Sequence, residues 1–529
     1  MTFTSLAFIE FLIAVVIVYF VAPKRMQWVV VLAANIAFYA FSGIKYMLYM
    51  LFTTAVTFYG AIVFENINKG IKEKTSQVET QDEKKAIRAA GIKKKKQIAF
   101  IMIFAVMFIW AVLKYGNFVI DNLNALFASL GAGARISRLS LVPALGMSFY
   151  TFQATGYMVD VYRGKYPAQR NYIKYFTFVS YFPHIMQGPF SRYDILGKSI
   201  LEEHDFSYDR LAAGVARIIW GFFKKIVIAD QIGIPVDKIF DNYQNYTGFN
   251  ILCVIFLYAI QIYADFSGYM DIVCGFSKIL GIDLQENFNQ PYFSKSIEEF
   301  WRRWHMTLCQ WFKDYLFYPI SMSKPVQRMG KNARNKLGSK WGRYVPVYFA
   351  LFFVWTSTGL WHGANWTYLI WGYLNFIVIT CSTHWAEYYI KAKNALHIKD
   401  GNPIWEGFRI LRTFALVALF RFFAVADTVS IAVGMIKRIF TDFAIKTVLA
   451  HPSNILPGLS KGEIVVLGIG TIVLVLVDVF REKGKWEDMK KNCPPVVRGL
   501  IFAGMLLLIM LIVPALGDAE TGEFMYANF

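Results

Sequence analysis

Seven long runs of apolar residues in this chain contain no charged side chain, and they restrict its fold more than any other feature. Most can be extended to the roughly 20 residues that cross a bilayer as a helix. The chain is 56% hydrophobic, so too little polar surface remains to cover so many apolar helices in water. We therefore expect an all-α, polytopic membrane protein. The runs are Val29–Phe41, Ile98–Leu113, Ile251–Ala264, Val345–Leu360, Phe414–Phe420, Ile464–Val477 and Leu500–Val513.

The net charge of +19 would suggest nucleic-acid binding in a soluble protein, but no nucleic-acid motif is present. The basic residues lie between apolar runs, where they set topology. Lys24 and Arg25 follow the first apolar stretch and place its end in the cytoplasm, so the N-terminus is expected outside and the first span stays as an anchor. Lysine and arginine also dominate residues 65–97 and 321–344, which we predict to be cytoplasmic loops.

The first of these loops, Glu65–Gln97, holds ten Lys or Arg against five Asp or Glu. A binding patch for anionic lipid is the alternative to a solvated loop. At the other end, Arg481–Lys491 is basic, so the last span near Val497–Pro514 should leave the C-terminus outside with its acidic tail, Gly517–Phe529. We expect a single integral membrane domain over residues 1–529, held in the cell membrane.

The middle of the chain is less regular than its ends. Between Pro143 and Pro319, apolar residues alternate with Gly, Pro, Gln, Asp and many aromatic residues. Irregular backbone at membrane depth is tolerated only where protein or a water-filled cavity surrounds it. We therefore expect re-entrant segments or short tilted helices here. The five cysteines show no paired spacing, so we predict neither a disulfide framework nor a metal site.

Three of the seven histidines stand in unusual surroundings. His362 lies between two apolar spans with glycines and tryptophans beside it, and an ionisable residue at such a depth is often paired or functional. His305 follows two acids and two arginines, a pattern that an amphipathic helix on the membrane surface also explains. His184 and Gln187 lie in a proline-rich turn, where a structural role in a cavity wall is the simpler interpretation.

Charged residues near these histidines need partners in a low dielectric. Asp265 closes an apolar run together with Asp271. Its carboxylate could orient a histidine or pair with Arg302 or Arg303. The sequence alone leaves these pairings open.

Seven short stretches, in order along the chain, resemble the membrane-bound O-acyltransferase family, and within it the bacterial alginate O-acetyltransferase type. The resemblance runs over nearly the whole chain and is most specific over residues 143–372. The stretches are Lys114–Phe118, Gly146–Gln153, Tyr181–Pro189, Tyr263–Tyr269, Asn287–Tyr292, Phe300–His305 and Leu360–Trp366.

The resemblance implies a fold, a reaction and a set of site residues. The fold would be a ring of transmembrane helices with re-entrant segments around a central funnel and tunnel. His362 would be the catalytic base and His305 the second histidine at the same tunnel. Supporting or tunnel-lining residues would be Asn365, Trp366, Trp361, Trp304, Asp265, Arg302, Arg303, His184 and Gln187.

The implied reaction moves an acyl group, most simply acetyl, from a cytoplasmic thioester to hydroxyls of an exported polysaccharide. The donor would be acetyl-coenzyme A or an acyl carrier protein, with no bound cofactor. An extracytoplasmic acetyltransferase partner would complete the transfer. Direct attack and a covalent acyl relay stay open. The alternatives are D-alanyl transfer to teichoic acid, a transporter, and a non-catalytic component of an export complex.

Overall fold

The computed structural model describes residues 5–43, 47–141, 144–399, 401–450 and 455–515, together with Phe524. The rest of the acidic tail Gly517–Phe529 lies outside the described residues. Within them the chain is almost entirely helical, and the one β-type pairing is an isolated bridge between Phe288 and Trp304. The prediction of an all-α protein is confirmed.

Contacts divide the chain into two compact units, and the first comprises residues 1–215 and 273–285. Helices α8 (Tyr208–Phe222) and α10 (Gly248–Leu280) contribute residues to both units. The other helices of the first unit are α1 (Leu6–Val21), η1 (Lys24–Met26), α2 (Gln27–Ser42), α3 (Met47–Ser76), α4 (Gln81–Ser129), α5 (Met147–Tyr162), α6 (Tyr172–Val179), η3 (Phe182–His184), η4 (Tyr193–Gly197) and α7 (Lys198–Leu201).

The second unit comprises residues 216–272 and 286–529. Its first half holds η5 (Phe223–Ala229), α9 (Asp230–Asp241), η6 (Tyr243–Asn245), η7 (Pro291–Phe293), α11 (Ile297–Arg303), α12 (Met306–Phe312), η8 (Lys313–Phe317), α13 (Tyr318–Ser321), α14 (Lys324–Leu337) and α15 (Ser339–His362). Its second half holds α16 (Trp366–His384), α17 (Ala386–Ala395), α18 (Pro403–Phe420), α19 (Phe422–Val425), α20 (Val429–Thr441), α21 (Ile445–Ala450), α22 (Lys461–Glu482), α23 (Trp486–Asn492) and α24 (Pro495–Ala515).

Six helices of the described chain are long and apolar enough to cross a membrane: α3, α4, α10, α15, α22 and α24. Five of the seven uncharged runs lie in these helices, as the sequence predicts. The other two runs lie in α2 and α18. Helix α2 has only 16 residues, and the 18 residues of α18 include Glu406, Arg409 and Arg412.

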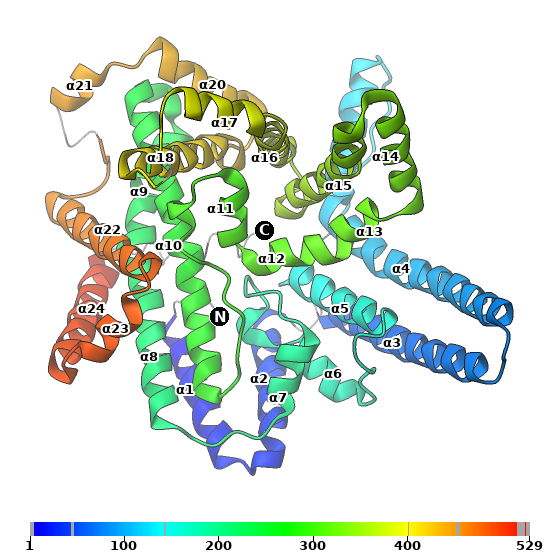
Figure 1. Cartoon of the computed structure of the whole chain (residues 1–529). Helices are drawn as coiled ribbons and strands as arrows, with labels where there is room; N and C mark the ends of the chain where they lie inside the picture. The colour runs from blue at the N-terminus through cyan, green and yellow to red at the C-terminus, as the bar shows by residue number, and fades with distance from the viewer. Residues whose placement is uncertain are drawn as a thin grey trace. The chain divides into compact units, whose positions relative to one another are not determined.

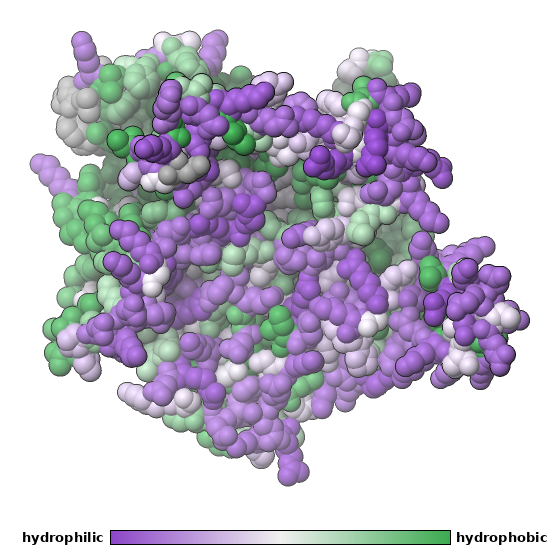
Figure 2. Space-filling view, in the orientation of Figure 1, coloured by the Kyte–Doolittle hydropathy of each residue, from purple (hydrophilic) through white to green (hydrophobic). Residues whose placement is uncertain are grey.

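Burial separates the interior helix of the second unit from its peripheral ones. In the apolar 18-residue stretch of α10, 67% of the residues are buried. The corresponding shares in α22 and α24 are 22% and 11%. Ile469 and Ile472 of α22 and Leu507 and Met510 of α24 are more than half exposed. Figure 2 shows hydrophobic residues gathered over these two helices. In a membrane protein such a surface faces lipid.

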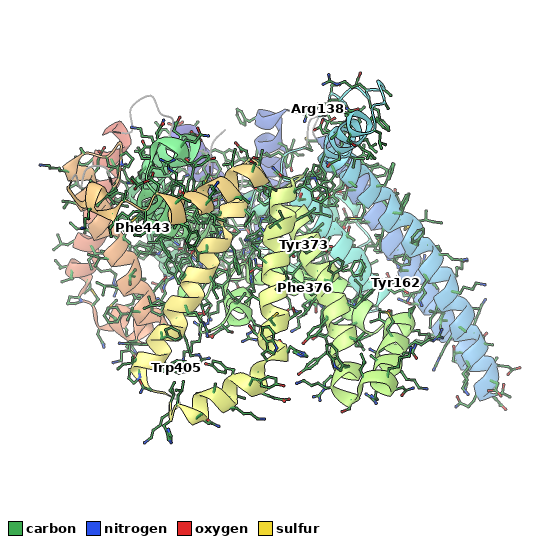
Figure 3. The ribbon with its side chains drawn as sticks, turned by 90° about the horizontal axis from the view of Figure 1, so that it is seen from above. Arg138, Tyr162, Tyr373, Phe376, Trp405 and Phe443 are labelled. Atoms are coloured by element: carbon green, nitrogen blue, oxygen red, sulfur yellow. The ribbon has the colours of Figure 1, made fainter. Side chains whose placement is uncertain are left out.

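The predicted basic loop Glu65–Gln97 is mostly helical. Helices α3 and α4 continue as an antiparallel pair to a short connection at residues 77–80 (Figure 1). Lys95 turns inward from the four-lysine run, and its Nζ donates to Asn68 Oδ1 at 2.6 Å and to the carbonyl of Tyr162 at 2.7 Å. The ring of Tyr162, labelled in Figure 3, lies 4.3 Å from the same Nζ. Lys95 therefore anchors α4 to the end of α5.

The middle of the chain contains short helices of the kind predicted for it, together with the 33-residue helix α10. Helix α6 has eight residues, and α11 and α12 have seven each. The second basic segment, residues 321–344, contains the 14-residue helix α14, which packs beside α15. Its cytoplasmic location stays a prediction.

Candidate active site

His305 occupies the break between α11 and α12. Helix α11 ends at Arg303, and His305 takes a left-handed conformation with φ 48° and ψ 48° before α12 begins at Met306. A non-glycine residue in this region is uncommon and costs energy, so a functional role is worth testing.

The His305 side chain is buried among aromatic and polar neighbours. Its ring meets Phe266 edge to face, with centroids 4.8 Å apart. Nδ1 lies 3.2 Å from Asn287 Nδ2 and 3.3 Å from Asn287 Oδ1. Burial lowers the pKa of His305 to about 3, so the folded protein holds a neutral imidazole near pH 7.

His362 is the last residue of α15, and its side chain is also buried. The imidazole meets the indoles of Trp361 and Trp371 edge to face, each with centroids 4.9 Å apart. The ring of Tyr368 stacks on it at 6.2 Å. Aromatic side chains from α15 and α16 therefore enclose the predicted catalytic base.

Two glycines bring α15 and α16 close together around His362. A Cβ on Gly359 would lie 2.7 Å from the carbonyl oxygen of Tyr368, and one on Gly372 would lie 2.7 Å from that of Trp355. Further along the same pair, Phe352 of α15 stacks on Tyr373 at 5.7 Å and meets Phe376 at 5.9 Å. Figure 3 labels these two α16 residues. Small residues at these two positions therefore let the backbones of α15 and α16 approach closely.

Trp361 connects the two predicted catalytic histidines. Its indole lies 5.8 Å from the ring of His305 and 4.9 Å from that of His362, centroid to centroid. His305 is far in the sequence from the adjacent pair Trp361 and His362, yet the three side chains form one cluster within the second unit. This cluster, His305–Trp361–His362, is the candidate active site.

The tryptophans of α11 and its C-terminal end build the wall behind this cluster. Trp304 is buried and stacks on Phe300 at 5.4 Å, with the guanidinium of Arg421 5.0 Å from its ring. Trp301 packs on Trp371 at 5.6 Å and donates from Nε1 to Asn375 Oδ1 at 2.9 Å. These contacts fix the segment that carries His305 against α16.

The charged residues find partners that the sequence did not identify. Asp265 pairs with Lys225 at 2.8 Å, and Lys225 also pairs with Asp230 at 2.8 Å. Asp271 pairs with Lys224 at 2.7 Å. Two adjacent lysines inside an apolar stretch are the sequence signal for such buried pairs.

Arg302 and Arg303 pair with glutamates instead, within α11 and in α22. Arg302 pairs with Glu298 at 2.6 Å in an exposed position. Arg303 binds Glu299 at 2.8 Å and Glu482 at 2.6 Å, which ties α11 to the end of α22. Both arginines support the segment of His305 through these ion pairs.

Asn365 and Trp366 follow His362 at the start of α16. The Asn365 side chain caps this helix by accepting from Thr367 N at 3.1 Å, and it donates to the carbonyl of Asp427 at 2.7 Å. Trp366 is 53% exposed. The described contacts therefore give Asn365 a positioning role in the turn that follows His362.

His184 and Gln187 belong to the first unit, where both are buried. His184 Nε2 lies 2.5 Å from Gln153 Oε1, and the ring of Tyr181 lies 5.4 Å away. Neither atom of the Gln187 amide has a hydrogen-bond partner within the described residues. Their link to the acyl-transfer site stays a prediction.

Sequence reasoning missed Asn287, Trp371 and Tyr368, which contact the two histidines. Asn287 lies in one of the recognised stretches, but its pairing with His305 appears only when the chain folds back on itself. In the described part of the chain, no group of three or more His, Cys, Asp or Glu side chains is arranged to hold a metal ion.

Comparison with known proteins decides the family. The model of the membrane-bound O-acyltransferase family matches residues 95–426, well over half of the chain. The chain belongs to the membrane-bound O-acyltransferase family. It is an O-acyltransferase with several membrane-spanning helices.

Relatives of this acyltransferase act on different acceptors. It is 30% identical to the probable alginate O-acetylase of Pseudomonas aeruginosa over 90% of this chain and 80% of the relative. It is 29% identical to the peptidoglycan O-acetyltransferase of Helicobacter pylori over 67% of this chain and 63% of the relative. The teichoic acid D-alanyltransferase of Bacillus subtilis is 30% identical over 48% of this chain and 62% of the relative.

Proposed function

We propose that this acyltransferase moves acetyl groups from a cytoplasmic thioester to hydroxyls of an exported cell-surface polysaccharide. The acceptor is an alginate-like polymer or a cell-wall glycan. The share of this chain that aligns with each relative supports this choice of acyl group and acceptor. The alignment with the alginate O-acetylase extends over 90% of the chain, whereas that with the D-alanyltransferase extends over 48%.

The cluster His305–Trp361–His362 is the single observation that carries the mechanism. Both imidazoles contact one indole, so they can act on the same bound acyl group. Acyl transfer to a hydroxyl needs a base for the hydroxyl proton and a donor for the negative charge on the acyl oxygen. Two buried histidines beside one another can divide these two tasks.

In the proposed reaction His362 accepts the hydroxyl proton while the hydroxyl oxygen bonds to the acyl carbon. The acyl oxygen gains negative charge in the tetrahedral intermediate. The carbon–sulfur bond then breaks, and the leaving thiolate takes the proton from His362. The products are the acyl ester and the free thiol, and the imidazole returns to its neutral form.

The thioester enters from the cytoplasm, where the basic segments at residues 65–97 and 321–344 lie in the proposed topology. Acetyl-coenzyme A and an acyl carrier protein both carry negative charge that suits this side. Both chain termini lie outside the cytoplasm. An extracytoplasmic acetyltransferase partner receives the group or completes its transfer to the polymer.

The test is the O-acyl content of the surface polysaccharide in cells that carry the wild type or one histidine variant at equal membrane expression. His362→Ala should abolish acylation, and His305→Ala should reduce it strongly. His384→Ala is the matched control, because His384 packs on Trp341 at 5.2 Å at the other end of α16. It should acylate as the wild type does.

Mild alkaline release of the esters identifies the acyl group. Acetate in the released fraction supports the proposal, and D-alanine would assign the chain to teichoic acid modification. Normal acylation by His362→Ala would overturn the catalytic assignment and favour a transporter or a non-catalytic export component. Purified protein that transfers acetyl from acetyl-coenzyme A to a saccharide would exclude both of these alternatives.

A further inference from the structure

The backbone around His305 is held by a short antiparallel pairing with residues 287–289. Asn289 N donates to the carbonyl of Arg303 at 2.9 Å, and Met306 N donates to the carbonyl of Asn287 at 3.0 Å. The isolated bridge between Phe288 and Trp304 lies between these two bonds. The pairing places the side chain of Asn287 beside the imidazole of His305.

Thr307 fixes the orientation of the Asn287 amide. Its backbone N lies 3.1 Å from Asn287 Oδ1, and its Oγ1 lies 2.9 Å from the same oxygen. A backbone N–H can only donate, so the amide oxygen must face Thr307. With two hydrogen bonds accepted, that oxygen has used the two lone pairs of a carbonyl.

The amide nitrogen of Asn287 therefore provides the contact to His305. Nδ2 lies 3.2 Å from His305 Nδ1 and 3.6 Å from the sulfur of Met270, so its two hydrogens have one acceptor each. A donor on Asn287 requires that His305 Nδ1 accept. In a neutral imidazole with an acceptor at Nδ1, the proton resides on Nε2.

We propose that Asn287 is a positioning residue that holds His305 as the neutral Nε2–H tautomer, so that His305 donates a hydrogen bond to the acyl oxygen. His305 is then the oxyanion donor, and the hydroxyl proton goes to His362 alone. The left-handed backbone at His305 serves this arrangement, because it turns the ring toward Asn287 between two helices. The assignment of the donor role rests on the proposed acyl transfer, whereas the assignment of the tautomer is independent of it.

The low pKa of the buried His305 suits the role of a donor. Because burial lowers the pKa of His305 to about 3, this ring is a weak base near pH 7. A neutral ring with a fixed N–H needs no base strength to stabilise a developing negative charge.

The first measurement is the tautomer itself, by nitrogen NMR of the full chain labelled with ¹⁵N-histidine in detergent micelles. The signals of His305 are those absent from a His305→Gln sample. A protonated Nε2 and an unprotonated Nδ1 are expected. Asn287→Asp should move the proton to Nδ1, because a carboxylate can only accept. A proton on Nδ1 in the wild type would overturn the proposal, whatever the enzyme transfers.

The second measurement is transfer of acetyl from acetyl-coenzyme A by purified variants. Asn287→Asp keeps an acceptor for Thr307, so α12 should still begin at Met306. It should lower kcat roughly 100-fold or more with little change in KM, as loss of an oxyanion donor does. Asn250→Asp is the control, because Asn250 is also buried and accepts from the N and Oγ1 of Thr247.

Asn250→Asp should leave kcat unchanged. A wild-type kcat in Asn287→Asp would show that the tautomer has no role in transfer and would overturn the proposal. If the wild type itself transfers no acyl group, the proposed function fails, while the NMR result still decides the tautomer.

Discussion

The indole of Trp361 meets the imidazole of His362 edge to face, with ring centroids 4.9 Å apart and ring planes at 83°. The same indole contacts His305, so a single side chain sets the spacing of both rings. Its removal should disturb both histidines at once.

Trp361→Ala should therefore lower kcat by about 100-fold, because misplacing a reacting group by about 1 Å has that effect. The void should also cost about 3–5 kcal/mol of stability. Trp361→Phe keeps an aromatic contact and should lose less of both. Transfer kinetics and thermal unfolding in detergent measure the two effects. Equal kcat in the two variants would show that the indole does not set the spacing.

Gly359 should not tolerate replacement by alanine, because a Cβ added there would lie 2.7 Å from the backbone oxygen of Tyr368. Gly359→Ala should push α15 and α16 apart and destabilise the protein by about 1–3 kcal/mol. Gly407 of α18 is the control, since a Cβ there would meet nothing within 4 Å. Gly407→Ala should leave the unfolding temperature equal or higher. Similar losses in both variants would contradict the proposed close approach.

Lys225 lies buried between two carboxylates, Asp230 and Asp265. Lys225→Met should leave these acids without their shared cation and destabilise the protein by about 3–5 kcal/mol. Adding Asp265→Asn should restore part of the loss. Arg302→Met, at an exposed ion pair, should change the unfolding temperature little. A harmless Lys225→Met would mean that the buried charges do not depend on one another.

Acid should destabilise the fold through two histidines. Burial lowers the pKa of His184 and of His305 to about 3, from an ordinary value near 6.5. The unfolded chain therefore takes up protons at these rings first, and protonation favours unfolding. The stability that depends on the neutral rings is present above about pH 6.5 and is lost as the pH falls toward 3.

The unfolding temperature should accordingly fall between about pH 7 and pH 5. In the variant His184→Gln, this fall in unfolding temperature should be smaller, because one of the two histidines no longer titrates. A fall of the same size in the variant would show that His184 is not protonated on unfolding.

Features that depend on the local composition of the chain can be predicted from the sequence. Uncharged runs locate α10, α15 and α24, and the motifs lead to His305 and His362, which the fold brings to one indole. The sequence does not predict the partners of charged and polar groups. Lys225 and Asp265 are 40 residues apart, and Asn287 and His305 are 18 apart. Their pairing depends on how helices pack, which periodicity does not encode.

The two lysines of η5 precede α10 in the chain, and this order has a consequence for biosynthesis. A helix with a carboxylate near its centre enters a bilayer at a cost of about 2.5–3.5 kcal/mol per charge. Asp265 and Asp271 leave the ribosome after Lys224 and Lys225, so their counter-ions already exist when α10 reaches the translocon. Lys224 and Lys225 are therefore available to pair with Asp271 and Asp265 while α10 enters the bilayer.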